Sequence, residues 1–326
     1  MNKLGKLIRD WMLPFAIVLG IGLYLAYHFS PALHAYGKWL HPMASEGQRL
    51  VIATLLFFQF VKISPHELKV TRWHLKALTL QVGLFLALAG IILFLEPGTP
   101  RTLLECAMLC FICPTASAAG VITDRLGGSL AATVTYLVII NITGTFLIPL
   151  VIPLVNPSAR MGFWTYVGHI ALKVFPVLIL PGLLAWLIRY TTHKLQRALM
   201  RWASNSFYIW GIGLTLAMVL STRSLLLSGM GLWSVAGIVV VSVIACFFQF
   251  WAGHRASKDR VDNLTAGQAL GQKNTGFLIW LGYHYLTPVT SVAGGLYAIW
   301  QNLFNSWELY EQAHKGEKEP VSGRPS

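Results

Sequence analysis

The segment Cys113-Pro114-Thr115-Ala116-Ser117 lies in the middle of an apolar run, residues 102–124, that is long enough to cross a lipid bilayer. Proline removes a backbone donor and clashes with the preceding turn, so we expect a helix over this run to break or kink at Pro114. A second apolar run, residues 262–284, is interrupted by Gly271-Gln272-Lys273-Asn274-Thr275-Gly276. A polar stretch at mid-membrane depth is tolerated mainly where it lines a cavity. The two interruptions therefore predict two broken helices that line one cavity.

The composition around these runs indicates a membrane protein. Of the 326 residues, 55% are hydrophobic and only 11% are charged, whereas a soluble domain carries about 25% charged residues. The formal net charge of +13 does not indicate a nucleic-acid partner, because Lys and Arg are concentrated in short loops between apolar runs. Cys106, Cys110, Cys113 and Cys246 lie inside apolar runs, and we expect them to be packing residues rather than disulfides or metal ligands.

The apolar runs predict an all-α polytopic membrane protein. A transmembrane helix needs about 20 mostly apolar residues. Ten runs of this kind are found, at residues 12–29, 46–62, 73–95, 102–124, 127–154, 163–189, 203–222, 231–252, 262–284 and 286–306. Residues 31–41 are expected to form a short interfacial segment, and residues 307–326 a polar cytoplasmic tail.

The distribution of Lys and Arg predicts the orientation. One set of alternate loops is rich in these residues, while the opposite set holds only Lys38, Arg49, Arg101, Arg160 and Arg223. The rich side is cytoplasmic by the positive-inside rule. An even number of helices then places both termini in the cytoplasm, and the protein is expected in the plasma (inner) membrane.

Ten helices divide into two halves of five, residues 1–155 and residues 156–306. An odd number of helices per half reverses the second half in the membrane, which predicts inverted-topology repeats. The interrupted helices are then the fourth and the ninth, at corresponding positions of the two halves. Paired discontinuous helices at such positions indicate the binding site of a secondary transporter.

The two interruptions, with Val121 and Thr123 after the first, resemble those of the bile acid:sodium symporter family. Pro288, Gly294-Gly295 and the stretch from Leu296 to Asn302 resemble the last helix of that family, so the likeness covers nearly the whole chain. It implies a panel domain of helices 1, 2, 6 and 7 and a core domain of helices 3 to 5 and 8 to 10. Helices four and nine would cross in the core, substrate would bind between panel and core, and rocking of the domains would give alternating access.

The likeness fails where that family binds sodium. Its ligands are hydroxyl, amide and carboxylate oxygens, and sodium, a hard ion, needs several of them in place of water. The corresponding positions here are Ala119, Gly120, Leu137, Ala269 and Lys273. Aliphatic side chains offer no ligand oxygen, and an ammonium group repels another cation. We therefore expect both sodium sites to be absent, without another metal or a cofactor; a sodium-coupled symporter with an altered site is the alternative.

Lys273 has three open roles. Its ammonium group could replace sodium as a fixed cation, donating hydrogen bonds to Gln81, Thr133, Gln272 or helix-end carbonyls. It could load and release a proton, since burial without a carboxylate partner favours the neutral amine. It could also be the counter-charge of an anionic substrate. The predicted site residues are Gln81, Pro114, Thr115, Ser117, Thr133, Gln268, Gln272, Lys273, Asn274 and Thr275, with His169 and Lys173 as further anion-attracting candidates.

The function that fits these features best is secondary transport of a small organic anion, with protons as a further candidate partner. Half-helix N-termini and Lys273 would give the crossover a positive potential. An integral-membrane enzyme would need a polar catalytic cluster at an interface, and the few intramembrane acids and scattered histidines form none. A non-transporting sensor would need a larger soluble domain than the tail. The sequence carries no phosphate loop, and it determines neither the substrate nor the oligomeric state.

Overall fold

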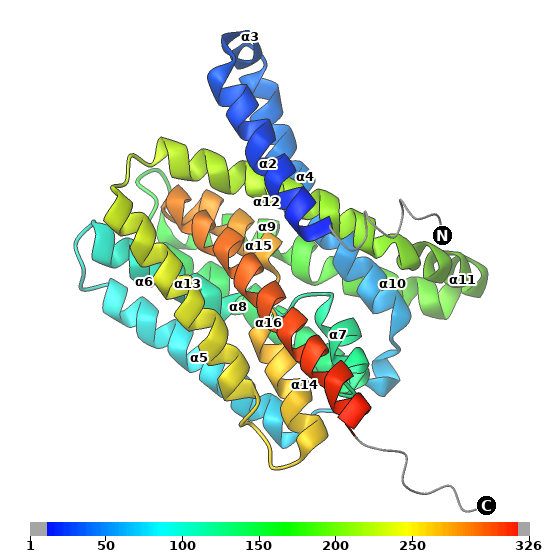
Figure 1. Cartoon of the computed structure of the whole chain (residues 1–326). Helices are drawn as coiled ribbons and strands as arrows, with labels where there is room; N and C mark the ends of the chain where they lie inside the picture. Colours follow the sequence, from blue (N-terminus) through cyan, green and yellow to red (C-terminus); the bar gives the residue numbers. More distant parts are fainter. Residues whose placement is uncertain (1–11, 319–326) are drawn as a thin grey trace, which may run out of the picture.

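The computed structural model describes residues 12–318, which are helical and contain no β-strand (Figure 1). The first half holds α2 (Met12–Phe29), α3 (Pro31–His34), α4 (Gly37–Lys62), α5 (Arg72–Ile92), α6 (Thr99–Ile112), α7 (Ala119–Arg125) and α8 (Leu130–Val155). The second half holds α9 (Phe163–Leu178), α10 (Leu180–Thr191), α11 (His193–Trp202), α12 (Ser206–Leu227), α13 (Leu232–Gly253), α14 (Arg260–Gly271), α15 (Thr275–Tyr285) and α16 (Ser291–Lys318). Three short 3₁₀ turns lie at Pro65–Glu67, Ala203–Asn205 and Pro288–Thr290.

Several of the described helices are suited to a membrane. Four are long and apolar enough to cross one, namely α5, α8, α13 and the part Tyr208–Leu227 of α12. The pair α9 and α10, bent by 41° at its break, gives a fifth if it is one span. These helices indicate a multi-pass membrane protein. The ten-span arrangement and the inverted repeats stay predictions, because the remaining runs form shorter, broken or less apolar helices.

Each of the ten predicted runs is occupied by one helix or by two helices with a short break. Two segments can be described in more detail than the sequence allowed. Residues 31–41 are divided between α3 and the start of α4 at Gly37. The Tyr27 hydroxyl on α2 lies 3.2 Å from Nε2 of His41 on α4 and ties the two helices together. The predicted tail, residues 307–326, is helical as far as Lys318, since α16 continues without a break. The two termini, residues 1–11 and 319–326, lie outside the described residues.

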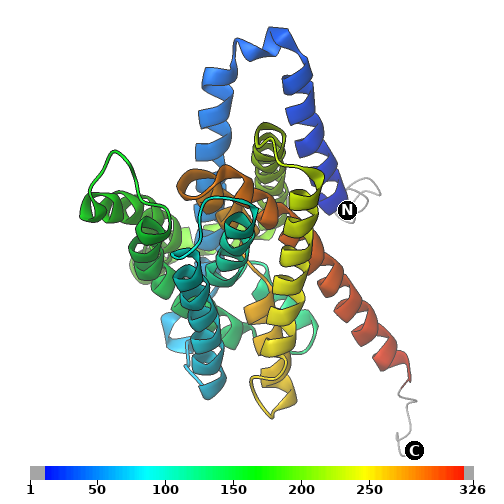
Figure 2. The ribbon, with the colours of Figure 1, turned by 90° about the vertical axis from the view of Figure 1, so that its left-hand side faces the viewer.

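The helices pack in two groups. The first contains α2, α4, α10 and α12, and the second contains α5, α6, α13, α14, α15 and α16. Contacts of α15 and α16 with α12, and of α15 with α4, join the groups. The pair of α2 and α4, joined by α3, projects beyond the other helices in both views (Figure 2). This packing is compatible with a panel and a core, a division that stays a prediction.

The second broken helix lies directly against α13. A side-chain Cβ added at Gly253 would lie 2.6 Å from Cα of Gly267 and 2.8 Å from the carbonyl carbon of Ala266. A Cβ added at Gly271 would lie 2.6 Å from a ring carbon of Phe250. Glycine at these positions lets the two backbones approach closely, which fixes α14 and the break that follows it.

Candidate functional site

The two broken helices meet at their breaks, an arrangement that the family resemblance implies. The chain leaves α6 at Cys113 and leaves α14 at Gln272. Thr115 and Lys273, which lie in the two unwound segments, pair as an antiparallel β-bridge. The hydroxyl of Thr115 also donates to the carbonyl of Ala269 at 2.6 Å, which ties the first break to the last turn of α14. We call these two paired segments the crossover.

Backbone groups freed by one break are satisfied by the other. The N–H of Ala116 donates to the carbonyl of Gln272 at 3.0 Å, and the N–H of Asn274 donates to the carbonyl of Pro114 at 2.8 Å. Backbone polar groups have no water to bind inside a bilayer, so they require partners of this kind. The two half-helices that leave the crossover are therefore held together by mutual main-chain bonds.

Two buried glutamines support the crossover from neighbouring helices. The side-chain amide of Gln81 on α5 donates to the carbonyl of Cys113 at 3.1 Å, while its oxygen accepts from the hydroxyl of Tyr136 at 2.7 Å. The side-chain oxygen of Gln301 on α16 accepts the N–H of Lys273 at 2.8 Å. Gln81 was among the predicted site residues, on the strength of the family resemblance, whereas Gln301 was not.

A small cavity of about 70 Å³ lies beside the crossover, between the two groups of helices. This volume is room for about two water molecules. The predicted residues that line it are Ser117, Gln272, Lys273, Asn274 and Thr275. Polar or aromatic lining residues that the sequence reasoning missed come from α4, α12 and α16, and they are Gln48, Trp210, Gln301 and Asn302.

Gln48 is the most informative of the missed residues. It is buried on α4, and its side-chain oxygen has no hydrogen-bond partner among the described residues. A Cβ added at Gly276 would lie 2.5 Å from the side-chain nitrogen of Gln48, so the amide packs against the first turn of α15. A polar residue inside the apolar helix α4 was the only local signal, and which cavity it faces depends on the tertiary fold.

The other predicted residues lie away from the cavity lining. The residues that are absent from the lining are Pro114, Thr115, Gln81, Gln268 and Thr133. The hydroxyl of Thr133 donates instead to the carbonyl of Ser129, one turn earlier in the chain, at 2.9 Å. His169 and Lys173 on α9 are not brought to the cavity. The buried face of α9 carries apolar residues and a tyrosine, and His169 is exposed on another face.

The side chain of Lys273 is fully buried, with 0% of its surface exposed. Its amine nitrogen has no hydrogen-bond partner among the described residues, so no predicted acceptor is in place. The titratable groups that interact with it are the buried thiols of Cys110, Cys113 and Cys246. In the described part of the chain, no group of three or more His, Cys, Asp or Glu side chains could hold a metal ion.

The family's sodium-ligand positions lie in this buried layer without side-chain oxygens. Ala119, Leu137 and Ala269 are each at most 1% exposed, and Gly120 is also buried. A Cβ at Gly120 would lie 2.5 Å from a methyl carbon of Leu130 and 3.2 Å from the side-chain nitrogen of Gln59. The side chains at these four positions therefore supply no oxygen where the resemblance implies ligand oxygens.

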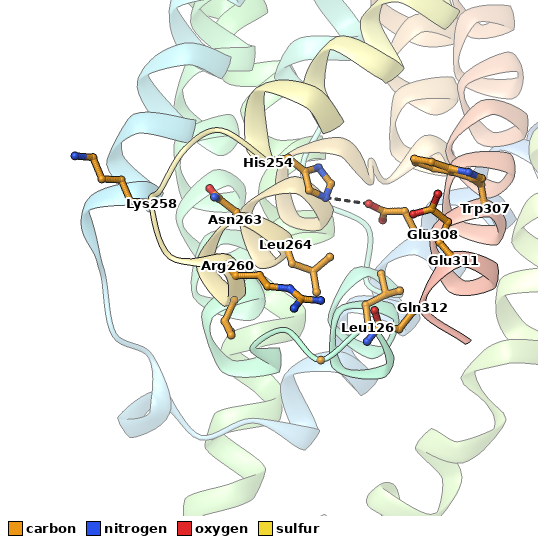
Figure 3. A pocket seen from close by; sticks show the side chains of 12 residues that line it. Leu126, His254, Lys258, Arg260, Asn263, Leu264, Trp307, Glu308, Glu311 and Gln312 are labelled. Carbon is orange, nitrogen blue, oxygen red and sulfur yellow. Dashed lines mark ion pairs between the residues drawn. The ribbon is translucent and has the colours of Figure 1, made fainter. Parts of the chain in front are cut away.

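A line of hydrogen-bonded side chains leads from the crossover to the end of α13. The amide of Gln272 donates to the side-chain oxygen of Gln268, and the amide of Gln268 donates to Oε2 of Glu308. Oε1 of Glu308 lies 2.9 Å from Nε2 of His254 (Figure 3). His254 and Glu308 line a second cavity of about 590 Å³, formed by the end of α7, the start of α14 and the last turns of α16.

Comparison with known proteins gives one family. A family model described as the SBF-like CPA transporter family matches residues 13–274, which includes both breaks of the crossover. This match is of the bile acid:sodium symporter type, so the predicted resemblance is confirmed over that range, while the likeness of residues 288–302 lies beyond it. No curated protein matches the chain.

Proposed function

Because the chain belongs to the SBF-like CPA transporter family, we propose that it carries a small organic anion across the membrane by alternating access without a sodium gradient. The observation that carries this proposal is the crossover with its adjoining polar cavity. The cavity lies between the two packed groups of helices, so a relative movement of the groups would open it to one side or the other.

The lining of the cavity supports an anionic substrate. The first turn of α15 faces it, and the N-terminus of a helix carries a partial positive charge and free N–H groups. The amide side chains of Gln48, Gln301 and Asn302 add further donors. No carboxylate is among the described residues that line the cavity. An anion in the cavity would therefore lie near the N-terminus of α15 and near side-chain amides from α4 and α16.

The chemistry around the crossover supports the lack of sodium coupling. The hydroxyl of Thr115 is used to bond the carbonyl of Ala269, and both polar atoms of the Gln81 side chain are occupied. Sodium would require several free oxygens in one place. Of the three roles open to Lys273, that of a fixed cation has the least support because its amine has no acceptor. A proton-dependent role is supported by the burial of the side chain, since burial of an amine without a hydrogen-bond partner favours its neutral form.

The proposal is tested by thermal unfolding of the purified protein with a panel of monocarboxylates, dicarboxylates, sulfonates and steroid carboxylates. A ligand that binds only the folded state stabilises it, by about 2.7 kcal/mol at a hundred times its Kd. We expect at least one organic anion to raise the melting temperature by several degrees, and to do so equally in sodium chloride and potassium chloride. A panel without any stabilising anion would overturn the proposed substrate class. Stabilisation only in sodium chloride would favour the sodium-coupled alternative.

Alternating access is tested at a contact between the two groups of helices. Oγ of Ser45 on α4 lies 2.8 Å from Nε2 of His284 on α15, and Arg223 on α12 donates to the hydroxyl of Tyr283. On the predicted topology these contacts close the outer side of the cavity. We expect a reversible bis-thiosulfonate reagent to cross-link Ser45→Cys to His284→Cys and to lower uptake of the stabilising anion by about tenfold or more.

A matched pair within one group of helices is the control for this cross-link. Oγ1 of Thr99 on α6 lies 3.0 Å from Oγ of Ser234 on α13. We expect the pair Thr99→Cys and Ser234→Cys to be cross-linked with little loss of uptake, because the two helices move together. Full uptake by the cross-linked Ser45 and His284 pair would contradict alternating access between these groups.

A further inference from the structure

We infer that His254 and Glu308 form a proton-binding site, and that Gln268 and Gln272 transmit its protonation state to the crossover. This inference rests on the proposed transport function and assigns the proton as the ion that acts on it. The four residues lie on three helices or directly after their last residues, and their hydrogen bonds form one continuous line (Figure 3 shows the end of the line at His254 and Glu308).

The geometry of His254 requires a proton on both ring nitrogens when Glu308 is ionised. Nδ1 lies 2.7 Å from the carbonyl oxygen of Phe250, which can only accept, so Nδ1 must carry hydrogen. Nε2 lies 2.9 Å from Oε1 of Glu308, and an ionised carboxylate can also only accept. A neutral imidazole has a single N–H and cannot satisfy both. The observed arrangement therefore holds one proton more than neutral histidine beside a carboxylate.

The side chains of His254 and Glu308 are partly shielded from water, so the interaction between their charges is weakened less by solvent than at an exposed surface. Their exposed fractions are 29% for His254 and 12% for Glu308. A Cβ added at Gly267 would lie 2.7 Å from Nε2 of His254, so the absence of a side chain on α14 leaves the space that the ring fills. Burial alone would lower the pKa of His254, but the hydrogen bond and the negative charge of Glu308 outweigh it and raise that pKa above its usual value.

The other charged groups around the pair are few. The loop after α13 contributes Lys258, α14 contributes Arg260, and α16 contributes Glu311, while the end of α7 contributes only Leu126 and Gly127. Lys258 points away from the cavity and Arg260 points into it (Figure 3). Glu308 is the charged group that lies within hydrogen-bond distance of His254, and its hydrogen bond and negative charge raise the pKa of the histidine.

The line of amides responds to what happens at Glu308. Both oxygens of Glu308 accept, one from His254 and one from Gln268. Loss of the proton from Nε2 places its lone pair against Oε1, so the carboxylate is repelled and Gln268 loses its acceptor. The side-chain oxygen of Gln268 in turn accepts from the side-chain amide of Gln272. The main-chain carbonyl of Gln272 accepts the N–H of Ala116 at 3.0 Å, and this bond belongs to the crossover. We expect the line to be intact below the raised pKa of His254 and to be released as the pH rises through it.

The test reads the crossover directly and uses no substrate. Ser117 lines the cavity together with Trp210, and the four native cysteines are buried. Bimane attached to Ser117→Cys in the full chain is quenched by a nearby tryptophan. We expect its emission to change about twofold as the pH rises from about 6 to about 9, with a midpoint above the ordinary histidine pKa of about 6.5.

Four further variants decide the assignment. In His254→Gln and in Glu308→Gln the pH-dependent change should be lost, while Lys258→Gln, in the same cavity, should keep it. Gln268→Leu leaves the pair in place and interrupts the line, so it should also lose the change; it serves as the test if the pair variants do not fold. A flat wild-type profile, or a change that persists in His254→Gln or Gln268→Leu, overturns the inference. The transport proposal fails separately, if no organic anion stabilises the protein.

Discussion

Lys273→Met is expected to raise the melting temperature of the protein by a few degrees and at the same time to abolish uptake of the stabilising anion. The amine of Lys273 is fully buried and has no hydrogen-bond partner among the described residues. Methionine has a similar length and no polar group to desolvate. Burying a polar group without a hydrogen bond costs about 1–3 kcal/mol, and methionine avoids this cost. Thermal unfolding and uptake into proteoliposomes measure the two effects.

Lys62→Met is the control for this substitution. Lys62 is half-buried in the last turn of α4, so its amine keeps access to water and its removal should change neither the melting temperature nor uptake appreciably. A lower melting temperature for Lys273→Met would mean that the amine has a stabilising partner. Unchanged uptake would remove Lys273 from the transport mechanism and leave the cavity amides as the substrate site.

Gly253→Ala is expected to disrupt the contact between α13 and α14. The added Cβ would lie 2.6 Å from Cα of Gly267 and 2.8 Å from the carbonyl carbon of Ala266, and backbone atoms cannot move aside as a flexible side chain can. Overpacking of this kind costs about 1–3 kcal/mol or more. We expect a lower melting temperature and a smaller folded fraction in size-exclusion chromatography. The displacement of α14 should also weaken the pairing of Thr115 with Lys273.

Gly83→Ala on α5 is the matched control, because a Cβ at Gly83 has no atom within 4 Å. Alanine is favoured over glycine in a helix interior by about 0.5–1 kcal/mol, so this variant should be at least as stable as the wild type. If Gly253→Ala were equally stable, the close approach of the two helices would not be needed for the fold.

The two breaks could be predicted from the sequence because their signals are local. Pro114 cannot continue a helix, and the polar run from Gly271 to Gly276 is costly in an apolar span. The packing role of the cysteines followed in the same way from their apolar neighbours. The contact between Tyr27 on α2 and His41 on α4 could not be predicted, because it joins two different helices.

The partners across the site could not be predicted, because they depend on residues far apart in the chain. Gln301 accepts the N–H of Lys273 from a helix that follows it, and no spacing in the sequence indicates this. His254 and Glu308 belong to no motif, and only the packing of α13 against α16 brings them together. The surroundings of the Lys273 amine could not be predicted either, because the sequence does not show that this side chain lies among thiols and without a hydrogen-bond partner in the described part of the chain.

Each interruption supplies the hydrogen-bond partners that the other requires. The bonds run from the N–H of Ala116 to the carbonyl of Gln272 and from the N–H of Asn274 to the carbonyl of Pro114. A change that restored a continuous helix on one side would leave two main-chain groups of the opposite segment without partners in the bilayer. Loss of one interruption alone would therefore be selected against during evolution. The two irregular segments have to be kept together or lost together, whatever side chains surround them.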